Sequence, residues 1–485
     1  MSSNLTSLEQ EFRSQRLAHL EALRAGGQTP FGRAFPRTGT LAQVLDGFEA
    51  DKEVSVAGRL VAIREMGKSQ FAHLQDGTGR LQLYVQKNAV GDDAFALWKK
   101  LDIGDIVGVT GTFFLTRTGE RTVRVAKWEL LSKALLPLPE KWHGLSDMET
   151  RYRARELDLI ANPAVRRVFD ARSRIISHLR RRLEDKGFLE VETPILQAQA
   201  GGAAATPFRA HYEALGQDMF LRIAPELYLK RLLVGGYDKV FELGKDFRNE
   251  GLDRSHNPEF TVLEIYEAYG DCRTMMDLVE DLVSSAAEAV TGSTTVPGSA
   301  DGTAPEIHLA RPWRRVAYDD IVREHAGADW FEKSREDAIA WARAQGLDIP
   351  GDWSHAEVTH EVYDKLIEKT LWEPTFVTRL PRELVPLAKR CPDDPAKVDV
   401  YELVVKGREL CPGYTELNDP LDQRARLEEQ AAGDGSKIDE AFLSALEHGM
   451  PPAGGLGIGV DRLVMILTAS DSIRDVLLFP QMKNL

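Results

Sequence analysis

Hydrophobic and polar residues alternate in a series of short runs between about residues 53 and 135. Such alternation places apolar side chains on one face of a β-strand, and Asp76-Gly77 and Thr118-Gly119 supply turns between runs. A helical stretch at residues 94–101 interrupts the series. Five strands with one inserted helix predict an OB-fold barrel. The runs are Val54–Val61, Gln70–Gln75, Leu81–Val85, Ile106–Phe113 and Thr122–Val125.

A helical pattern precedes the predicted barrel. In residues 7–25, Leu8, Phe12, Leu20 and Leu23 form a broad apolar stripe, and two glycines follow. This spacing predicts an amphipathic helix that ends at the glycines. A packing role or a peripheral arm is the usual use of such a helix, and we assign it no function.

The segment 247–260 gathers a fixed cation, hydrogen-bond acceptors and an aromatic ring in one short span. Arg248 offers a planar fork of donors suited to a phosphate, and Glu250 can accept a hydrogen bond from an exocyclic amine. Phe260 is able to lie flat against a purine. The flanking runs predict two strands joined by a loop, hence a hairpin. The alternative is a surface hairpin in which Arg248 and Glu250 pair only with each other.

A glycine-rich strand feeds a helix near the C-terminus. Residues 454–459 contain four glycines, and an apolar run begins at Leu463. Glycines let a ligand approach the backbone closely, and Arg462 adds a second fixed cation in the first helical turn, near the positive end of the helix. Tight turns also need glycine, so the cluster alone does not identify a site.

These two segments resemble motifs two and three of the class II aminoacyl-tRNA synthetases. The segment Gly187–Leu196, which follows a basic helical run, resembles motif one, through which that class builds its dimer interface. Three further segments resemble the lysyl-tRNA synthetases of the bacterial type, and the similarity covers nearly the whole chain. They are Leu221–Lys230, Tyr414–Pro420 and Ser472–Pro480.

The resemblance implies an α+β fold, with an N-terminal OB-fold barrel followed by a class II catalytic domain in which helices flank an antiparallel sheet. We expect a helical arm at 1–52, an anticodon-binding barrel at 53–150 and a catalytic domain at 151–485 with a helical insertion at about 315–370. A proline-bearing segment, residues 135–142, marks the exit from the barrel. The length of 485 residues fits two or three domains.

The resemblance also implies a reaction and its partners. We expect ATP to activate L-lysine to an adenylate, and the lysine to pass to the 3′ end of tRNA(Lys), in a homodimer that joins through Gly187–Pro194. No protein nucleophile or general base is needed, because positioning and charge neutralisation supply the acceleration. Arg248 and Arg462 are the expected catalytic residues. The full set expected to bind ATP is Arg248, Glu250, His256, Asn257, Phe260 and Arg462.

Two carboxylates are predicted to converge. Residues 401–410 predict two short strands around Lys406-Gly407, which places Val404 opposite Glu409, with Glu402 diagonally on the same face. Convergent carboxylates repel each other unless a divalent cation joins them, and hard oxygen ligands suit Mg²⁺ held against phosphates. Solvated strand carboxylates are an equal alternative on spacing alone. The resemblance implies Mg²⁺ on ATP at Glu402 and Glu409.

The resemblance places acceptors for a cationic amino acid at Glu226 and Glu416. A buried carboxylate that a neutral amino acid leaves unpaired costs on the order of 1–3 kcal/mol, which favours lysine. An aspartate-specific relative would need basic groups there instead. The full set expected around the amino acid is Gly202, Glu226, Glu264, Tyr266, Tyr414 and Glu416.

Phe71, His73 and Gln75 alternate onto one face of a predicted barrel strand, with Arg80 on the next strand. Exposed aromatics in such folds stack unpaired bases, and nearby polar groups read base edges and phosphates. Pattern alone favours Phe71 as ordinary barrel core. The resemblance reverses this preference, because the family reads anticodon bases from the matching face.

Composition restricts the other possibilities. The net charge of −14 argues against a non-specific polyanion binder, yet residues 1–150 hold 19 basic and 18 acidic side chains against 42 and 57 in the remainder, which fits RNA contact through a local patch. Three widely spaced cysteines predict neither a disulfide framework nor a zinc cluster. The chain shows no apolar run of about 20 residues and no signal peptide at its start, so we expect a cytoplasmic protein without a membrane span.

Two positions depart from the family pattern. Pro412 replaces a usual asparagine near the substrate, and Thr206 replaces a usual cation near the entrance. Alternatives to the expected activity are a paralogue with altered amino-acid specificity, including one that transfers lysine or a relative to a protein, and a silent RNA-binding paralogue. A silent paralogue is expected to have lost Arg248, Glu409 or Arg462, and all three are present.

Overall fold

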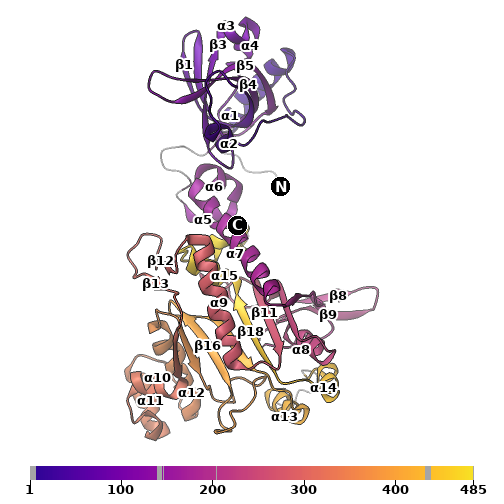
Figure 1. The fold of residues 1–485 in the computed structure, drawn as a ribbon, viewed down its shortest axis with the longest axis vertical. Coiled ribbons are helices and arrows are strands. Elements are labelled where there is room, and N and C mark those ends of the chain that lie inside the picture. Colours follow the sequence, from indigo (N-terminus) through magenta and orange to yellow (C-terminus); the bar gives the residue numbers. More distant parts are fainter. Residues whose placement is uncertain (1–6, 139–144, 146, 204, 432–437, 484–485) are drawn as a thin grey trace. The chain divides into compact units, whose positions relative to one another are not determined.

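The computed structural model divides the chain into two compact units, Met1–Ser146 and Asp147–Leu485 (Figure 1). The residues that the structure describes are 7–138, 145, 147–203, 205–431 and 438–483. Each unit has its own hydrophobic core. Every helix within the described residues is too short or too polar to span a lipid bilayer.

The N-terminal unit is a closed five-stranded barrel, as the alternating runs predict. Its strands pair in the order β1-β2-β3-β5-β4. Two short helices, α3 (Lys87–Val90) and α4 (Asp92–Trp98), form the predicted interruption between β3 and β4. The strand bounds are β1 (Glu53–Met66), β2 (Ser69–Gln75), β3 (Arg80–Gln86), β4 (Ile106–Leu115) and β5 (Arg121–Ser132).

The predicted N-terminal helix is confirmed as α1 (Ser7–Ala25), which precedes α2 (Leu41–Asp46). Only its second half packs in the unit, since Leu20 and Leu23 are buried whereas Leu8 is 59% exposed and Phe12 38%.

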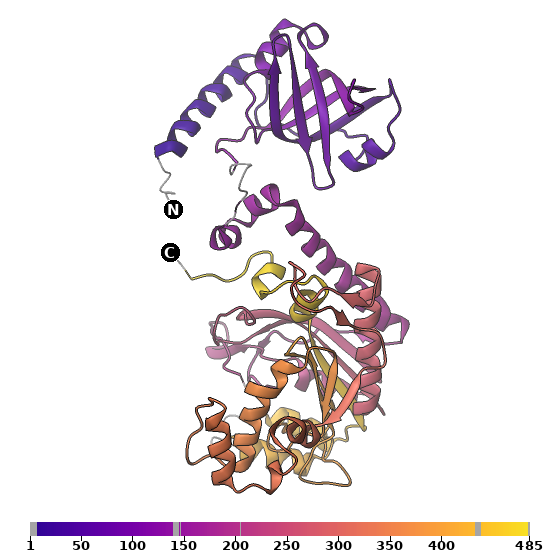
Figure 2. The same cartoon turned by 90° about the vertical axis from the view of Figure 1, so that its left-hand side faces the viewer.

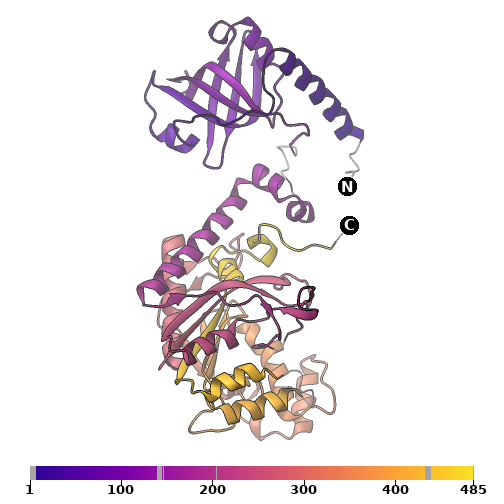
Figure 3. The ribbon, with the colours of Figure 1, turned by 90° about the vertical axis from the view of Figure 1, so that its right-hand side faces the viewer.

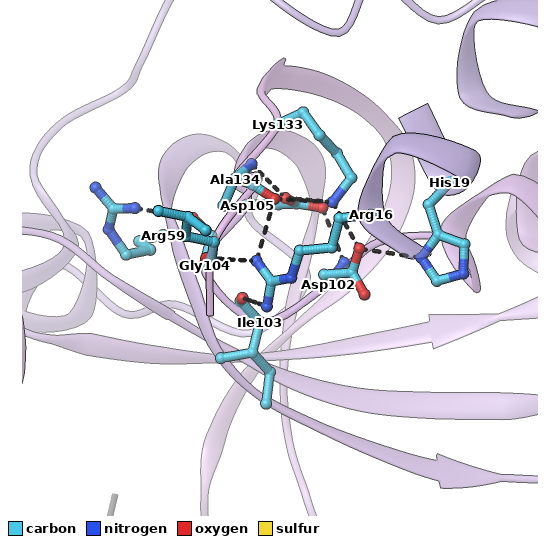
Figure 4. Close-up of polar contacts among 10 residues, drawn as sticks. Arg16, His19, Arg59, Asp102, Ile103, Gly104, Asp105, Lys133 and Ala134 are labelled. Atoms are coloured by element: carbon cyan, nitrogen blue, oxygen red, sulfur yellow. Dashed lines mark hydrogen bonds and ion pairs between the residues drawn. The ribbon is translucent and has the colours of Figure 1, made fainter. Parts of the chain in front are cut away.

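A buried polar network fixes α1 to the barrel (Figure 4). The ammonium of Lys133 donates to Asp102 at 2.6 Å and to Asp105 at 3.0 Å. Arg16 donates to the carbonyls of Ile103, Ala134 and Leu136, so one helical side chain holds both a barrel turn and the segment that leaves β5.

The second unit is built on an eight-stranded sheet. The strands from β15 to β10 pair antiparallel, as expected of the class II fold, and each edge strand pairs parallel to its neighbour. Their spatial order and bounds are β14 (Arg314–Ala317), β15 (Thr375–Thr378), β16 (Val400–Val405), β17 (Arg408–Thr415), β18 (Ala453–Gly459), β11 (Glu259–Ala268), β10 (Lys239–Phe247) and β6 (Leu189–Glu190).

Helices cover both faces of this sheet, because successive strand residues alternate between two cores. Phe376 and Tyr401 join the core of α7 (Pro163–Asp185), α9 (Cys272–Thr291) and α15 (Val460–Leu467), whereas Val377 and Val400 join the core of the insertion. The predicted helical insertion at about 315–370 gathers at one end of the unit (orange in Figure 2). It contains α10 (Tyr318–Ala326), α11 (Arg335–Ala344), α12 (His355–Val362) and short turns at Trp330–Glu332, Tyr363–Ile367 and Glu368–Thr370.

Smaller elements complete the unit, and α13 and α14 lie side by side (Figure 3). The helices are α5 (Met148–Arg153), α6 (Arg155–Ala161), α8 (Glu226–Val234), α13 (Pro420–Ala431), α14 (Glu440–Glu447) and α16 (Ile473–Val476). The short strands are β7 (Leu196–Gln197), β8 (Arg209–Tyr212), β9 (Gln217–Leu221), β12 (Thr295–Val296) and β13 (Ile307–His308).

Candidate active site

The predicted hairpin is confirmed as β10 and β11, which pair from Lys239 opposite Glu267 to Phe247 opposite Glu259. Arg248 continues the pairing just beyond β10, since its amide donates to the carbonyl of Pro258 at 2.9 Å. The backbone of the hairpin therefore fixes the position from which the Arg248 side chain projects.

A cavity of about 310 Å³ opens beside this hairpin. It brings together all six residues that the sequence analysis assigns to ATP, from the hairpin and from the start of α15. These lining residues are Arg248, Glu250, His256, Asn257, Phe260 and Arg462.

The guanidinium of Arg248 keeps donors available in this cavity. Its Nε is buried and has no hydrogen-bond partner among the described residues, and its Cζ lies 5.1 Å from the centre of the Phe260 ring. None of the ion pairs in the described part of the chain joins Arg248 to Glu250, so the alternative in which these two residues only pair with each other is wrong. His256 instead pairs with Asp253 at 2.9 Å.

Arg462 lines the same cavity from another element. The predicted glycine-rich strand is β18, and it runs directly into α15, whose first turn carries Arg462. One guanidinium nitrogen donates to the carbonyl of Glu409 at 2.6 Å. The remaining N–H groups of the guanidinium are available to a ligand in the cavity that Arg462 lines. The neighbouring Asp461 accepts from Arg172 at 2.5 Å and from the amide of Thr261 at 2.7 Å, and so fixes the start of α15 against β11.

The cavity exists because two neighbouring strands separate. Pairing of β17 with β18 covers only Gly413–Thr415, and below it Glu409 and Pro412 line the space across from Gly457. Pro412 has no amide hydrogen to offer a neighbouring strand, so it fits a position where this pairing has already ended.

A second cavity, of about 680 Å³, adjoins the first, and Glu409 and Pro412 line both. The predicted turn at Lys406-Gly407 is present with positive φ at both residues, and Val404 lies opposite Glu409 as predicted. A shift of register after Leu403 places Glu402 opposite Pro412.

Glu402 and Glu409 both line this larger cavity, and each is half-buried, so the two carboxylates face a common space. Burial, followed by the charges of Glu409 and Glu368, raises the pKa of Glu402 to about 8. Sequence reasoning missed Glu368, whose side chain accepts from the amide of Glu409 at 2.7 Å and whose pKa is raised to about 7 by burial and then by Glu409. Such excess negative charge fits a divalent cation.

The described residues contain no group of three or more His, Cys, Asp or Glu side chains arranged to hold a metal alone. A cation at the Glu402–Glu409 pair would therefore take further oxygen ligands, for which phosphate oxygens are suited. The donor set fits Mg²⁺ shared between protein and substrate, the arrangement that the sequence analysis expects.

The residues assigned to the amino acid lie around the junction of the two cavities. Gly202, Glu226 and Tyr414 line the larger cavity and Glu264 the smaller. Gly202 has φ of +87°, and a Cβ there would lie 3.3 Å from Cβ of Glu226, so glycine allows the loop to close over that carboxylate. Tyr266 and Glu416 are buried beside this group, and the Tyr266 hydroxyl donates to Glu264 at 3.1 Å.

A lysine of the chain itself connects the two predicted acceptors. The ammonium of Lys230 lies 2.6 Å from Glu226 and 2.5 Å from Glu416, and its side chain is fully buried. Burial alone would lower the pKa of Lys230, but Glu226 and Glu416 raise it, so the ammonium stays charged. Sequence reasoning missed this residue, although the spacing of four between Glu226 and Lys230 on a helix signals the pair.

Comparison with known proteins follows the division into two units. Residues 147–483 match the model of the tRNA synthetases class II (D, K and N), and residues 54–131 match that of an OB-fold nucleic acid binding domain. The chain belongs to the class II tRNA synthetases of the D, K and N group.

Named relatives of this class II tRNA synthetase cover nearly all of it. A lysine–tRNA ligase of Pelotomaculum thermopropionicum is 50% identical over 480 residues, which is 96% of this chain and 94% of the relative. A lysine–tRNA ligase of Carboxydothermus hydrogenoformans is 50% identical over 478 residues, 96% and 97% of the two chains. One of Staphylococcus aureus is 48% identical over 490 residues, 97% and 98%.

The barrel of this class II tRNA synthetase carries the other predicted site. Ala72 and Leu74 from β2 fill the barrel interior, whereas Phe71 lies half-buried on the outer face and stacks on Tyr84 with ring centres 4.7 Å apart. The core alternative for Phe71 is therefore wrong. Arg80 donates to Gln75 at 2.7 Å.

A groove of about 710 Å³ runs over this outer face. His73 and Arg80 line it together with Gln82 and Glu120. Sequence reasoning missed Glu120, which accepts from Gln82 at 2.6 Å and lies 3.4 Å from His73. The loop before β5 thus adds a carboxylate to a face that also carries the predicted polar side chains.

Proposed function

We propose that this class II tRNA synthetase is a lysine–tRNA ligase. It activates L-lysine with ATP to lysyl-adenylate, releases pyrophosphate and transfers the lysine to the 3′ end of tRNA(Lys). The cluster of buried carboxylates Glu226, Glu264 and Glu416 next to the cavity of Arg248 and Arg462 carries the proposal. The names of its relatives support it.

On the nucleotide side, Arg248 and Arg462 are the catalytic residues. They approach the same cavity from two walls, and neither guanidinium is neutralised by an ion pair among the described residues. Two fixed cations placed in this way stabilise the charge that spreads over phosphate oxygens in the transition state. The carboxylate of the lysine attacks the α-phosphorus, and pyrophosphate leaves with the bonding electrons.

Glu402 and Glu409 would hold Mg²⁺ against the ATP phosphates. When bound there, the ion neutralises phosphate charge and orients the triphosphate. Glu368 and Tyr363 support the pair, since Glu368 accepts from the amide of Glu409 and the Tyr363 hydroxyl donates to Glu402 at 3.2 Å.

On the amino-acid side, the charges favour a cation. An aspartate would place its own carboxylate among Glu226, Glu264 and Glu416, and the one cation that touches two of them, Lys230, is already engaged. Like charges held close together in a buried site repel strongly. Lysine, with two ammonium groups, finds acceptors for both.

We further propose that 53–150 is the anticodon-binding domain, 1–52 a helical arm and 151–485 the catalytic domain. The chain is proposed to act as a homodimer through Gly187–Pro194. In support, Leu189 and, just beyond the segment, Ile195 and Leu196 present exposed apolar side chains. Large apolar side chains that are exposed in one subunit become buried where two subunits meet. The mass of the purified protein in solution tests this assembly.

Replacing Phe71 with alanine is expected to weaken tRNA charging and spare adenylate formation. Loss of one base stack costs about 1–3 kcal/mol, which corresponds to a rise of roughly 5- to 150-fold in KM for tRNA(Lys). Aminoacylation and ATP–pyrophosphate exchange are measured side by side. Phe31→Ala, which removes an exposed ring outside β2 and β3, is the matched control, and an unchanged KM for tRNA in Phe71→Ala would refute the anticodon assignment.

The proposed function is tested by ATP–pyrophosphate exchange with each of the twenty amino acids, ornithine and β-lysine. Exchange is expected with lysine, and removal of Mg²⁺ by a chelator is expected to stop it. Preference for an analogue would identify a paralogue with altered specificity. In that case Pro412→Asn, which restores the residue usual in the family, is the first variant to examine. The silent paralogue predicts no exchange with any amino acid.

A further inference from the structure

Lys230 is a buried cation that the proposed chemistry does not use directly. It lies on α8 and reaches Glu226 in the first turn of its own helix and Glu416 just after β17. One ammonium group thus joins a helix to the central sheet at the floor of the amino-acid site.

The charges around this site can be balanced residue by residue. Arg222 pairs with Glu242 and with Asp246 at 3.0 Å, and none of the ion pairs among the described residues joins it to Glu226, Glu264 or Glu416. The charges of three carboxylates, Glu226, Glu264 and Glu416, all act on the buried Tyr266 hydroxyl, and with burial they raise its pKa. Set against them is the single ammonium of Lys230.

Three carboxylates therefore face one ammonium, so the site holds more carboxylate oxygens than Lys230 can pair with. Free lysine carries two ammonium groups, one at each end. Its carboxylate is the reacting group. The substrate therefore brings N–H donors for carboxylate oxygens that Lys230 leaves unpaired, which neither a neutral apolar nor an acidic side chain supplies.

We propose that Lys230 is a specificity-determining residue that sets the charge of the amino-acid pocket. By pairing with both Glu226 and Glu416, its ammonium reduces the negative charge that the pocket presents to a ligand. This inference rests on the proposed function, because the second ammonium is that of the lysine substrate.

The two carboxylate oxygens of Glu416 have different surroundings, which supports this proposal. One carboxylate oxygen, Oε2, contacts Lys230, whereas Oε1 is buried and has no hydrogen-bond partner among the described residues. A buried acceptor without a partner costs free energy, which a donor from the ligand recovers. Lys230 thus acts as a positioning residue through Glu416, and it presents the free oxygen in a fixed direction.

The experiment compares Lys230→Met, Glu416→Gln and the double variant in lysine-dependent ATP–pyrophosphate exchange. Each single variant changes the charge of the pocket and is expected to raise KM for lysine by about 10-fold or more. The double variant removes one charge of each sign and restores the balance, so its KM for lysine is expected to lie below that of either single variant. KM for ATP is expected to stay within about 2-fold throughout.

Lys333→Met is the matched control. Lys333 also pairs with a carboxylate four residues earlier, Asp329, at 2.5 Å, but the pair lies at the surface of the insertion. This variant is expected to leave both KM values unchanged. A purely structural role for Lys230 predicts instead that the effects of Lys230→Met and Glu416→Gln on KM for lysine add in the double variant, or that KM for ATP rises together with KM for lysine. Either result would overturn the proposal.

Folding is checked by thermal unfolding of each variant. If Lys230→Met does not fold, the double variant, which removes one charge of each sign, still decides, because a KM for lysine above that of Glu416→Gln alone would contradict the proposal. The ranking of the three variants by KM for the activated amino acid tests the role of Lys230, whichever amino acid the unchanged protein activates. The identity of that amino acid tests the proposed function. The two can therefore fail separately.

Discussion

Replacing Arg462 with alanine is expected to abolish lysine-dependent ATP–pyrophosphate exchange, with a loss of at least about 10³-fold in kcat/KM. The reason is that the charge on the transferring phosphates develops in a cavity that both Arg248 and Arg462 line. The folded state loses little, since the described contacts of the side chain include one hydrogen bond, to the carbonyl of Glu409, worth about 1 kcal/mol. Activity and thermal stability should therefore separate.

Two companion variants sharpen the interpretation. Arg462→Lys keeps the charge but loses the planar fork, so we expect a smaller yet clear defect. Arg424→Ala removes an exposed arginine that pairs with Glu440 at 2.7 Å, and it controls for loss of an arginine remote from the cavity. If kcat/KM for exchange by Arg462→Ala lies within about 10-fold of that of the unchanged protein, Arg462 does not stabilise the transition state as proposed.

Much of this architecture follows from local patterns. Strict alternation gave the barrel strands, because each strand has one buried face, as the alternating burial of β2 shows. The helix at Ser7–Ala25 follows from its stripe and its terminal glycines, and the hairpin turn at Lys406-Gly407 fixes Glu409 opposite Val404. In each of these elements the signal and the structure lie within a few residues of each other.

The features that sequence reasoning missed depend on contacts between distant segments. Glu368 meets Glu409 across 41 positions, and Lys230 meets Glu416 across an even longer separation. No local period brings such residues together. The register shift after Leu403 is a further case, since a bulge depends on how two strands meet and not on the alternation within either one.

The packing around Gly455 leads to the second large effect, because a side chain at this position has no space. A Cβ at Gly455 would lie 2.0 Å from Oε1 of Glu416 and 2.5 Å from the ring of Tyr266. Both neighbours are buried, and Lys230 holds Glu416 in place. Gly455→Ala must therefore displace the carboxylate that is proposed to receive the lysine ammonium.

We expect Gly455→Ala to lower kcat/KM for lysine by about 10²-fold or more, since a misplacement of about 1 Å is enough for a loss of that size. Overpacking is also expected to cost about 1–3 kcal/mol of stability, so thermal unfolding is measured beside exchange. Gly457→Ala is the comparison variant on the same face of β18, where the nearest atom to a new Cβ is 3.7 Å away on Glu264, an ordinary contact distance. Because Gly457 lines the cavity of Arg248 and Arg462, this variant is expected to affect KM for ATP more than KM for lysine. Equal losses in both variants would mean that the strand tolerates no side chain at all, and that the fixed position of Glu416 is not what lysine activation requires.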